Sequence, residues 1–338
     1  MKAIGYYNPL PVSDDQSLVD IEVPTPQLGA RDILVEVEAI SVNPADVKIR
    51  ASAIPPEGSP RILGYDAAGI VQAVGPEVSL FKKGDEVFYA GAIDRPGTYA
   101  ELHAVDERIV GRKPASLSFA EAAALPLTAI TAWEMLFDRL QVGRRHHPDS
   151  GAILVIGGAG GVGSIAIQLA RRLTGLRVIA TASRPETRDW CFSLGAHDVV
   201  DHRSDLPAQL KAIGAEQVRY VFSTTNTNAH WPAITSVVAP QGQVGLIDDP
   251  ESFDVRPLKR KSASLHWEFM FTRPVFGTDD IAEQGVLLNE VAQMVDAGTL
   301  RTTLAERFGK ISAQNLRRAH TLVESGRARG KVVLEGFA

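Results

Sequence analysis

A cluster of glycines in the middle of the chain has the spacing needed to hold a pyrophosphate. Residues 152–156 form a short apolar β-type run, and a helix-type pattern at 162–173 follows the glycines at once. Glycine permits a tight turn and close approach of the backbone to phosphate oxygens, and a helix N-terminus carries partial positive charge. We therefore predict a dinucleotide-binding turn, with contacts from Gly158, Gly160, Gly161, Val162 and Gly163.

The same stretch has an alternative interpretation as a membrane span, because residues 151–170 carry no charge. Six glycines lie in it, and each costs about 1 kcal/mol relative to alanine inside a helix. The glycines therefore favour the strand–turn–helix interpretation, and we expect no membrane segment.

The next predicted strand spans residues 176–181. The residues that follow it indicate which dinucleotide is bound. In NADH-binding folds, a carboxylate about 20 residues past the glycines usually accepts a hydrogen bond from the ribose 2′-hydroxyl. Here the strand leads instead into Ser183 and Arg184, and Arg188 follows one helical turn later. Guanidinium groups make charge-assisted bonds to a 2′-phosphate, so we predict NADPH. The alternative is that both arginines are solvated charges at a helix start.

Composition excludes several classes of protein. The chain has 338 residues, a length typical of about two domains, and its formal charge is −5 without a basic block that would indicate nucleic-acid binding. The single cysteine, Cys191, excludes an internal disulfide and a multi-cysteine zinc site. We expect no signal peptide and a reducing, cytoplasmic setting.

The elements that position these residues form two domains. Residues 1–126 are mostly β-type, as in the alternating run 33–40, whereas strands and helices alternate over 127–272. Such alternation predicts a parallel sheet covered on both faces. We expect the tail, 273–338, to return to the β-rich domain. The predicted strands of the middle part are 152–156, 176–181, 199–201, 218–223 and 244–247, and its helices are 162–173, 185–194, 206–213 and 229–238.

Several segments resemble the medium-chain dehydrogenase/reductase superfamily, namely residues 42–50, 63–71, 81–87, 123–126 and 157–163. Within it the chain is most similar to the quinone oxidoreductase (zeta-crystallin-like) branch. The runs 180–187, 265–268 and 334–337 resemble a bacterial subgroup labelled zinc-type alcohol dehydrogenase-like. The resemblance implies an α/β protein with a discontinuous GroES-like catalytic domain, 1–126 and 273–338, and a doubly wound Rossmann domain, 127–272.

The resemblance also implies that the catalytic zinc of the alcohol dehydrogenases is missing. A cysteine stands in the zinc-dependent relatives where this chain has Asn43, and a histidine stands where it has Tyr65. Asparagine and tyrosine are poor zinc ligands. The remaining histidines do not supply a site, and His146-His147 is expected in a surface loop.

By the same resemblance, Asn43 and Tyr65 lie beside the nicotinamide. Tyr65 would donate a hydrogen bond to the developing negative oxygen, and Asn43 would orient the substrate or the ribose. Asp46 and Lys48 would order this loop or reach the cofactor, and a structural ion pair is the alternative. A quinone or an α,β-unsaturated carbonyl spreads its own charge and can accept hydride without a metal.

The aromatic segment 265–271 has two interpretations. His266, Phe269 and Phe271 would wall the acceptor site, or the segment would form an edge strand that pairs with a second subunit. Leu246 and Asp248 end the last strand, where open parallel sheets bind ligands.

The sequence thus predicts a homodimeric, NADPH-dependent, zinc-independent reductase of quinones or enones. The alternatives are a zinc-dependent alcohol dehydrogenase and an NADPH-binding structural or sensor protein with little turnover.

Overall fold

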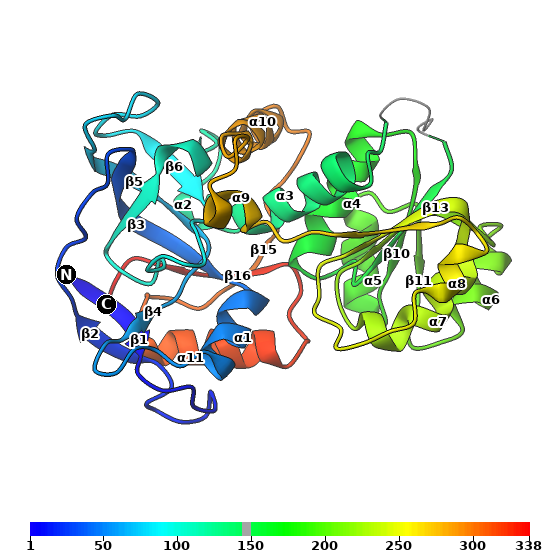
Figure 1. Cartoon of the computed structure of the whole chain (residues 1–338), viewed down its shortest axis with the longest axis horizontal. Helices are drawn as coiled ribbons and strands as arrows, with labels where there is room; N and C mark the ends of the chain where they lie inside the picture. The colour runs from blue at the N-terminus through cyan, green and yellow to red at the C-terminus, as the bar shows by residue number, and fades with distance from the viewer. Residues whose placement is uncertain (144–149) are drawn as a thin grey trace. The chain divides into compact units, whose positions relative to one another are not determined.

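A computed structural model describes residues 1–143 and 150–338, and the chain divides into two units (Figure 1). The first unit contains Met1–Ile130 together with Phe271–Ala338, and the second contains Thr131–Met270. The sequence placed these divisions at 126/127 and 272/273. His146 and His147 lie outside the described residues.

The first unit is built on two β-sheets. The larger has the order β15-β16-β3-β5-β6-β8, with β7 also paired to β3, and the smaller has the order β2-β1-β4. In β3, Val35 and Val37 are buried while Glu36 is exposed, the alternation expected of a strand with one face on the core. The strands are β1 (Lys2–Tyr6), β2 (Val19–Glu22), β3 (Asp32–Val42), β4 (Arg61–Ile62), β5 (Ala67–Val74), β6 (Glu86–Tyr89), β7 (Leu102–Asp106), β8 (Val110–Arg112), β15 (Leu304–Arg307) and β16 (Lys331–Glu335).

The C-terminal tail contributes β15 and β16 to the larger sheet. Strand β16 runs antiparallel to β3, with Val332 opposite Val42. The α-helices of the first unit are α1 (Pro44–Ser52), α2 (Phe119–Ala123), α9 (Thr272–Phe276), α10 (Glu283–Asp296) and α11 (Ala313–Glu324), and α3 (Pro126–Trp133) begins in it. A capping box of Ser118 and Glu121 opens α2.

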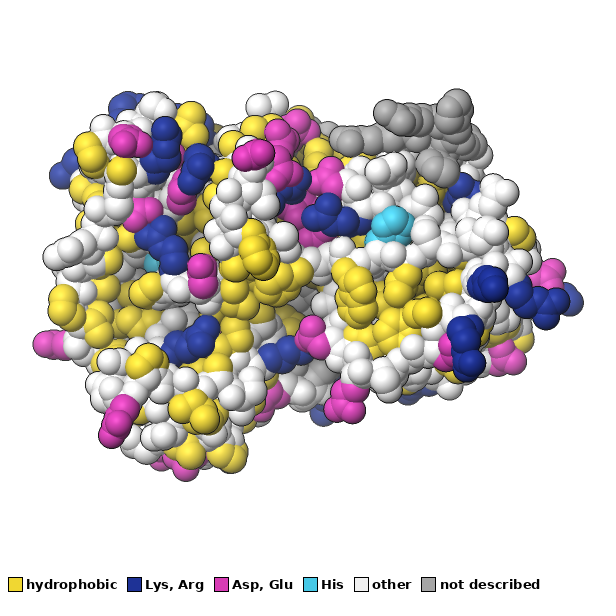
Figure 2. Space-filling view, in the orientation of Figure 1, with side chains coloured by type: hydrophobic (Ala, Val, Ile, Leu, Met, Phe, Trp, Pro, Cys, Tyr) yellow, Lys and Arg dark blue, Asp and Glu magenta, His cyan; other side chains and the backbone are white. Residues whose placement is uncertain are grey.

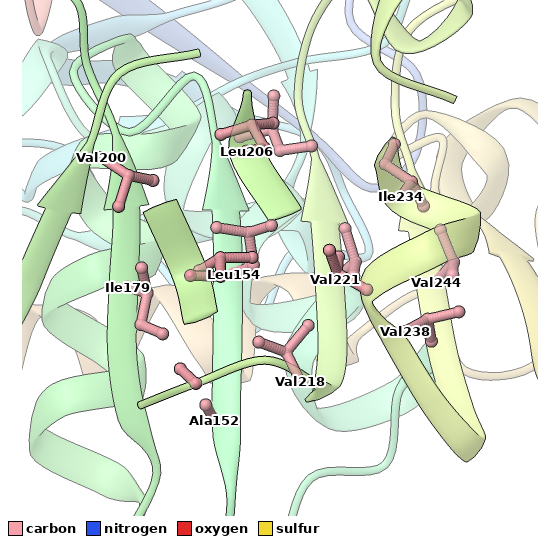
Figure 3. Close-up of a cluster of buried hydrophobic side chains, with 14 of the residues drawn as sticks. Ala152, Leu154, Ile179, Val200, Leu206, Val218, Val221, Ile234, Val238 and Val244 are labelled. Atoms are coloured by element: carbon pink, nitrogen blue, oxygen red, sulfur yellow. The ribbon is translucent and has the colours of Figure 1, made fainter. Parts of the chain in front are cut away.

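The second unit contains the predicted parallel sheet, in the order β11-β10-β9-β12-β13-β14. All five residues of β9 are buried, which is expected of a strand covered on both faces. Figure 3 shows Leu154 and Val221 on the sheet together with Leu206 and Ile234 from helices, within one apolar cluster. The strands are β9 (Ala152–Ile156), β10 (Arg177–Thr181), β11 (Asp198–Val200), β12 (Val218–Ser223), β13 (Val238–Leu246) and β14 (Ser264–Trp267).

Helices accompany each strand crossover of this sheet, as expected for parallel connections. They are α4 (Gly161–Leu173), α5 (Pro185–Ser193), α6 (Leu206–Ala212), α7 (Thr227–Val237) and α8 (Arg256–Lys259), and a π-helix, η2 (Glu134–Arg139), precedes β9. Among the described residues of the chain, no helix is long and apolar enough to cross a membrane.

A buried acid pair lies where η2 meets the end of β14. Glu134 and Glu268 are almost fully inaccessible, and Arg139 Nε lies 2.8 Å from Glu268 Oε2. Burial raises the pKa of Glu268 to about 9, the nearby Glu134 carboxylate raises it further, and Arg139 offsets only part of this. The pair of Glu134 and Glu268 therefore keeps a proton at neutral pH.

This pair makes the stability of the protein depend on pH. The unfolded chain releases the Glu268 proton near pH 4.5 and the folded chain keeps it until about pH 9, so stability falls as pH rises between these values. Glu268→Gln removes the titrating proton. We expect the unfolding midpoint in urea to fall less between pH 7 and 9 in this variant than in the wild type.

Glu216→Gln is the control, because Glu216 lies in the same unit but 71% of its side chain is exposed. It should keep the wild-type slope. Equal slopes in all three proteins would show that Glu268 titrates at an ordinary pH.

Candidate active site

The glycine turn between β9 and α4 leaves no room for side chains at two of its positions. Gly157 has φ +79°, and a Cβ on it would lie 2.4 Å from Thr224 Oγ1. A Cβ on Gly163 would lie 2.3 Å from the Gly157 carbonyl oxygen. Thr181 fixes the turn to the end of β10, since its Oγ1 accepts from the Gly157 N–H at 3.0 Å and its carbonyl accepts from Gly158 N–H at 3.1 Å. Only glycine fits at 157 and 163.

The start of α4 presents free backbone donors. Gly160 is the N-cap and has no side chain to cap the helix, and its carbonyl accepts the first helical bond, from Ser164 N–H at 2.9 Å. The N–H groups of Gly161, Val162 and Gly163 precede that bond and have no partner within the helix. Together with the helix dipole they suit an anion.

The other predicted cofactor residues at the sheet end have internal roles as well. The Leu246 carbonyl accepts from the Glu268 N–H at 3.0 Å. The Asp248 carboxylate accepts from the Thr227 N–H at 2.8 Å and also from the Thr227 hydroxyl. Asp248 thus caps the N-terminus of α7. Both remain candidates for cofactor contact.

Ser183, Arg184 and Arg188 follow β10 as predicted, and all three are partly exposed. Arg184 precedes α5, and its Nε lies 3.1 Å from Glu186 Oε1. The Ser183 carbonyl accepts from Arg203 Nη2 at 2.6 Å. This contact brings a third guanidinium group to the loop, one that the sequence analysis did not identify.

In the first unit, Asn43 belongs to a buried polar network. Its Nδ2 donates to Asp66 Oδ2 at 2.7 Å, and its Oδ1 accepts from the Lys331 ammonium group. Lys331 Nζ also lies 3.0 Å from Asp66 Oδ2 and donates to the Val42 carbonyl at 3.1 Å. The Ser41 hydroxyl also donates a hydrogen bond to Asp66 Oδ2, at 2.7 Å. Each side chain of this network is therefore satisfied internally.

Tyr65, next to Asp66 in the chain, differs from these neighbours. Its side chain is 1% exposed, and its hydroxyl oxygen has no hydrogen-bond partner of normal geometry. Burial, and then the Asp46 carboxyl group, raise the pKa of Tyr65 to about 12, against a smaller opposing effect of Arg61. The phenol is therefore protonated at neutral pH and has a hydrogen bond to give.

Asp46 lies in the first turn of α1 and closes a capping box. Its Oδ2 accepts from the Asn43 N–H at 2.8 Å, and its Oδ1 accepts from the Gly64 N–H at 2.9 Å. Burial raises its pKa to about 7, and the Asn43 N–H opposes this most strongly. Asp46 thus ties α1 to the residue before Tyr65.

The predicted pocket residues are distributed over both units. Phe271 packs edge-on against Tyr65 in the first unit, with ring centroids 5.2 Å apart, whereas Lys48 is exposed on α1. His266 and Phe269 belong to the second unit, and His266 Nε2 lies 2.9 Å from Ser264 Oγ.

These residues do not fit a catalytic zinc. A zinc ion needs donors with free lone pairs in a tetrahedral arrangement. Asn43 Oδ1 and Asp66 Oδ2 already face the Lys331 ammonium group, which would repel a divalent cation, and Tyr65 keeps its proton. Within residues 1–143 and 150–338, no group of three or more His, Cys, Asp or Glu side chains could hold a metal ion.

Lys331 and Asp66 are the site residues that sequence analysis missed. A signal was present for each: Asp66 follows Tyr65 in a segment already selected, and Lys331 opens a strand in which three apolar residues follow it. Neither signal shows that the two side chains meet.

Two families match the chain. Residues 29–115 match the alcohol dehydrogenase GroES-like domain, and residues 194–334 match the zinc-binding dehydrogenase family. A zinc-type alcohol dehydrogenase-like protein of Staphylococcus aureus is 40% identical over 99% of both chains. The 2-methylene-furan-3-one reductase of Solanum lycopersicum is 30% identical over 95% of this chain and 76% of its own length.

Solved structures agree with these matches. A Rhizobium etli protein, described as a candidate zinc-dependent alcohol dehydrogenase, is 60% identical over 100% of this chain and 98% of its own, with a TM-score of 0.97. Escherichia coli quinone oxidoreductase complexed with NADPH is 26% identical over 99% of this chain and 100% of its own, with a TM-score of 0.82. The chain is therefore an oxidoreductase of the medium-chain dehydrogenase/reductase superfamily, similar to its zinc-type alcohol dehydrogenase-like members.

Proposed function

We propose that the protein is an NADPH-dependent, zinc-independent reductase of quinones or α,β-unsaturated carbonyl compounds. Two relatives support this class by their names, since one is a quinone oxidoreductase complexed with NADPH and another reduces a 2-methylene-furan-3-one. The buried Cys191 thiol is in keeping with a reducing cytoplasm, which we include in the proposal.

The observation that carries the proposal is the unpartnered Tyr65 hydroxyl beside a network that holds an ammonium group. A buried hydroxyl without a partner loses about 1–3 kcal/mol, which an acceptor oxygen would restore. NADPH, when bound, supplies the hydride. Tyr65 would donate to the oxygen on which negative charge develops. Asn43, whose Nδ2 donates to the Tyr65 carbonyl, and Asp46, which accepts from the Gly64 N–H, would hold the backbone on either side of the Tyr65 side chain.

The preference for NADPH rests on the loop after β10. Arg184 and Arg188 supply positive charge to this loop. Position 183 is a serine, not the aspartate or glutamate that would bind the ribose hydroxyls of NADH. A 2′-phosphate would gain charge-assisted bonds there that an unphosphorylated ribose would lack.

Turnover by metal-free protein tests the proposed reaction. We expect protein treated with a chelator to oxidise NADPH with 9,10-phenanthrenequinone or a long-chain enal as fast as untreated protein, because no step uses zinc. Added zinc should not increase the rate. Loss of activity on chelation would favour a zinc alcohol dehydrogenase, and absence of turnover with either acceptor would favour an NADPH-binding protein.

Tyr65→Phe tests the donor. It removes only the hydroxyl, so we expect kcat to fall about 10²-fold, within the range of such donors, while Kd for NADPH stays within about twofold. Tyr89→Phe is the matched control, since Tyr89 is a buried tyrosine of the same unit whose hydroxyl bonds His103 Nδ1 at 3.1 Å. Unchanged turnover in Tyr65→Phe would remove Tyr65 from the mechanism.

We further propose that β14 pairs with a second copy of the chain. It ends the six-stranded sheet and has only β13 beside it within the described residues. Trp267 and Phe269, at this edge, are each 51% exposed, and hydrophobic side chains gather on the visible face of the second unit in Figure 2. An uncovered edge strand with exposed aromatic side chains is prone to aggregation, so pairing would protect it.

Trp267→Glu tests this dimer. A charge placed on the edge should convert a dimer into a monomer in sedimentation equilibrium. Phe276→Glu is the control, because Phe276 is 75% exposed but lies in the first unit. A monomeric wild type, or a Trp267→Glu variant that remains dimeric, would contradict the proposal.

A further inference from the structure

Arg203 lies in the turn after β11 and connects two groups. One of its guanidinium nitrogens, Nη2, donates both to the Ser183 carbonyl at 2.6 Å and to Asp201 Oδ2 at 3.0 Å. Its Nε donates to Asp201 Oδ1 at 3.2 Å. The same nitrogen therefore bridges the Asp201 carboxylate and the loop after β10.

The Asp201 carboxylate is unfavourable for the cofactor proposed above. Hydrogen bonds from Arg203 hold the pKa of Asp201 below its usual range, so it is ionised at neutral pH. A carboxylate that shares a guanidinium nitrogen with the Ser183 carbonyl would repel a 2′-phosphate bound at the loop after β10. The phosphate is tolerated only if the carboxylate is neutralised.

The same local pairing occurs elsewhere without the contact to Ser183. Asp254 and Arg256 have the same spacing and bond through the same atoms, with Arg256 Nε 2.8 Å from Asp254 Oδ1. The pair of Asp106 and Arg108 repeats the pattern in the first unit. The spacing alone therefore gives a local ion pair, and the bond to Ser183 is the feature that assigns Arg203 a different role.

We propose that Arg203 determines cofactor preference by neutralising Asp201 beside the Ser183 loop, so that a 2′-phosphate is accepted there. This inference rests on the proposed use of NADPH. Arg203 is 63% exposed, so one edge of its guanidinium group is free to approach the phosphate while the other holds the carboxylate.

Arg203→Gln tests the inference through binding of NADPH and NADH, measured by calorimetry. We expect Kd for NADPH to rise about tenfold, because the Asp201 carboxylate would then repel the 2′-phosphate. Solvent and salt screen this repulsion, which keeps the effect moderate. Kd for NADH should change less than about twofold. Arg256→Gln, which breaks the equivalent exposed pair, should leave both constants unchanged.

The double variant Asp201→Asn/Arg203→Gln tests the mechanism, because it removes the carboxylate as well. It should regain most of the lost affinity for NADPH, whereas a role limited to direct contact with the phosphate would leave affinity low. An Arg203→Gln protein with the wild-type NADPH:NADH ratio, or a double variant without recovery, would overturn the inference while the proposed reductase stands. A wild type without preference for NADPH would overturn both.

Discussion

The buried ammonium group of Lys331 is the constraint on which the first unit depends. Lys331 is 3% exposed, and a charge so far from water is stable only when it is paired and fully hydrogen-bonded. Its partners are Asp66 and the Asn43 amide, which lies 288 residues earlier in the chain. The tail must therefore return to β3 for the network to close, and the network ties the two segments of the β-rich unit together.

This buried cation also limits the chemistry of the site. In a zinc enzyme, a metal ion polarises the substrate and its donors must keep lone pairs free. Here the donor atoms of Asn43 and Asp66 are committed to Lys331, and the positive charge is held inside the protein. In the proposed mechanism, the substrate would therefore meet a neutral hydrogen-bond donor, the Tyr65 hydroxyl. Such a donor is adequate for an acceptor that disperses charge and weak for a simple alcohol or ketone.

Sequence patterns predicted the second unit well because its signals are local. A buried apolar strand, a glycine turn and a helix follow one another directly, and β9 and β12 have the predicted ends. The first unit was harder. Strands β1 and β2 lack long apolar runs, and α1 was not predicted although Asn43, Pro44 and Asp46 have the residue types of a helix start. The contact of Lys331 with Asn43 joins distant residues, so no pattern along the chain indicates it.

Asp46 and Tyr65 show why the identity of a residue does not decide its role. Burial raises the pKa of both, and each was a candidate for catalysis on the resemblance alone. Both Asp46 oxygens accept backbone N–H groups, so moving its proton or its side chain would also break the cap of α1. The Tyr65 hydroxyl has no such bond to lose. A proton donor must exchange partners during a reaction, and of these two side chains only Tyr65 can do so without disturbing the fold that positions it.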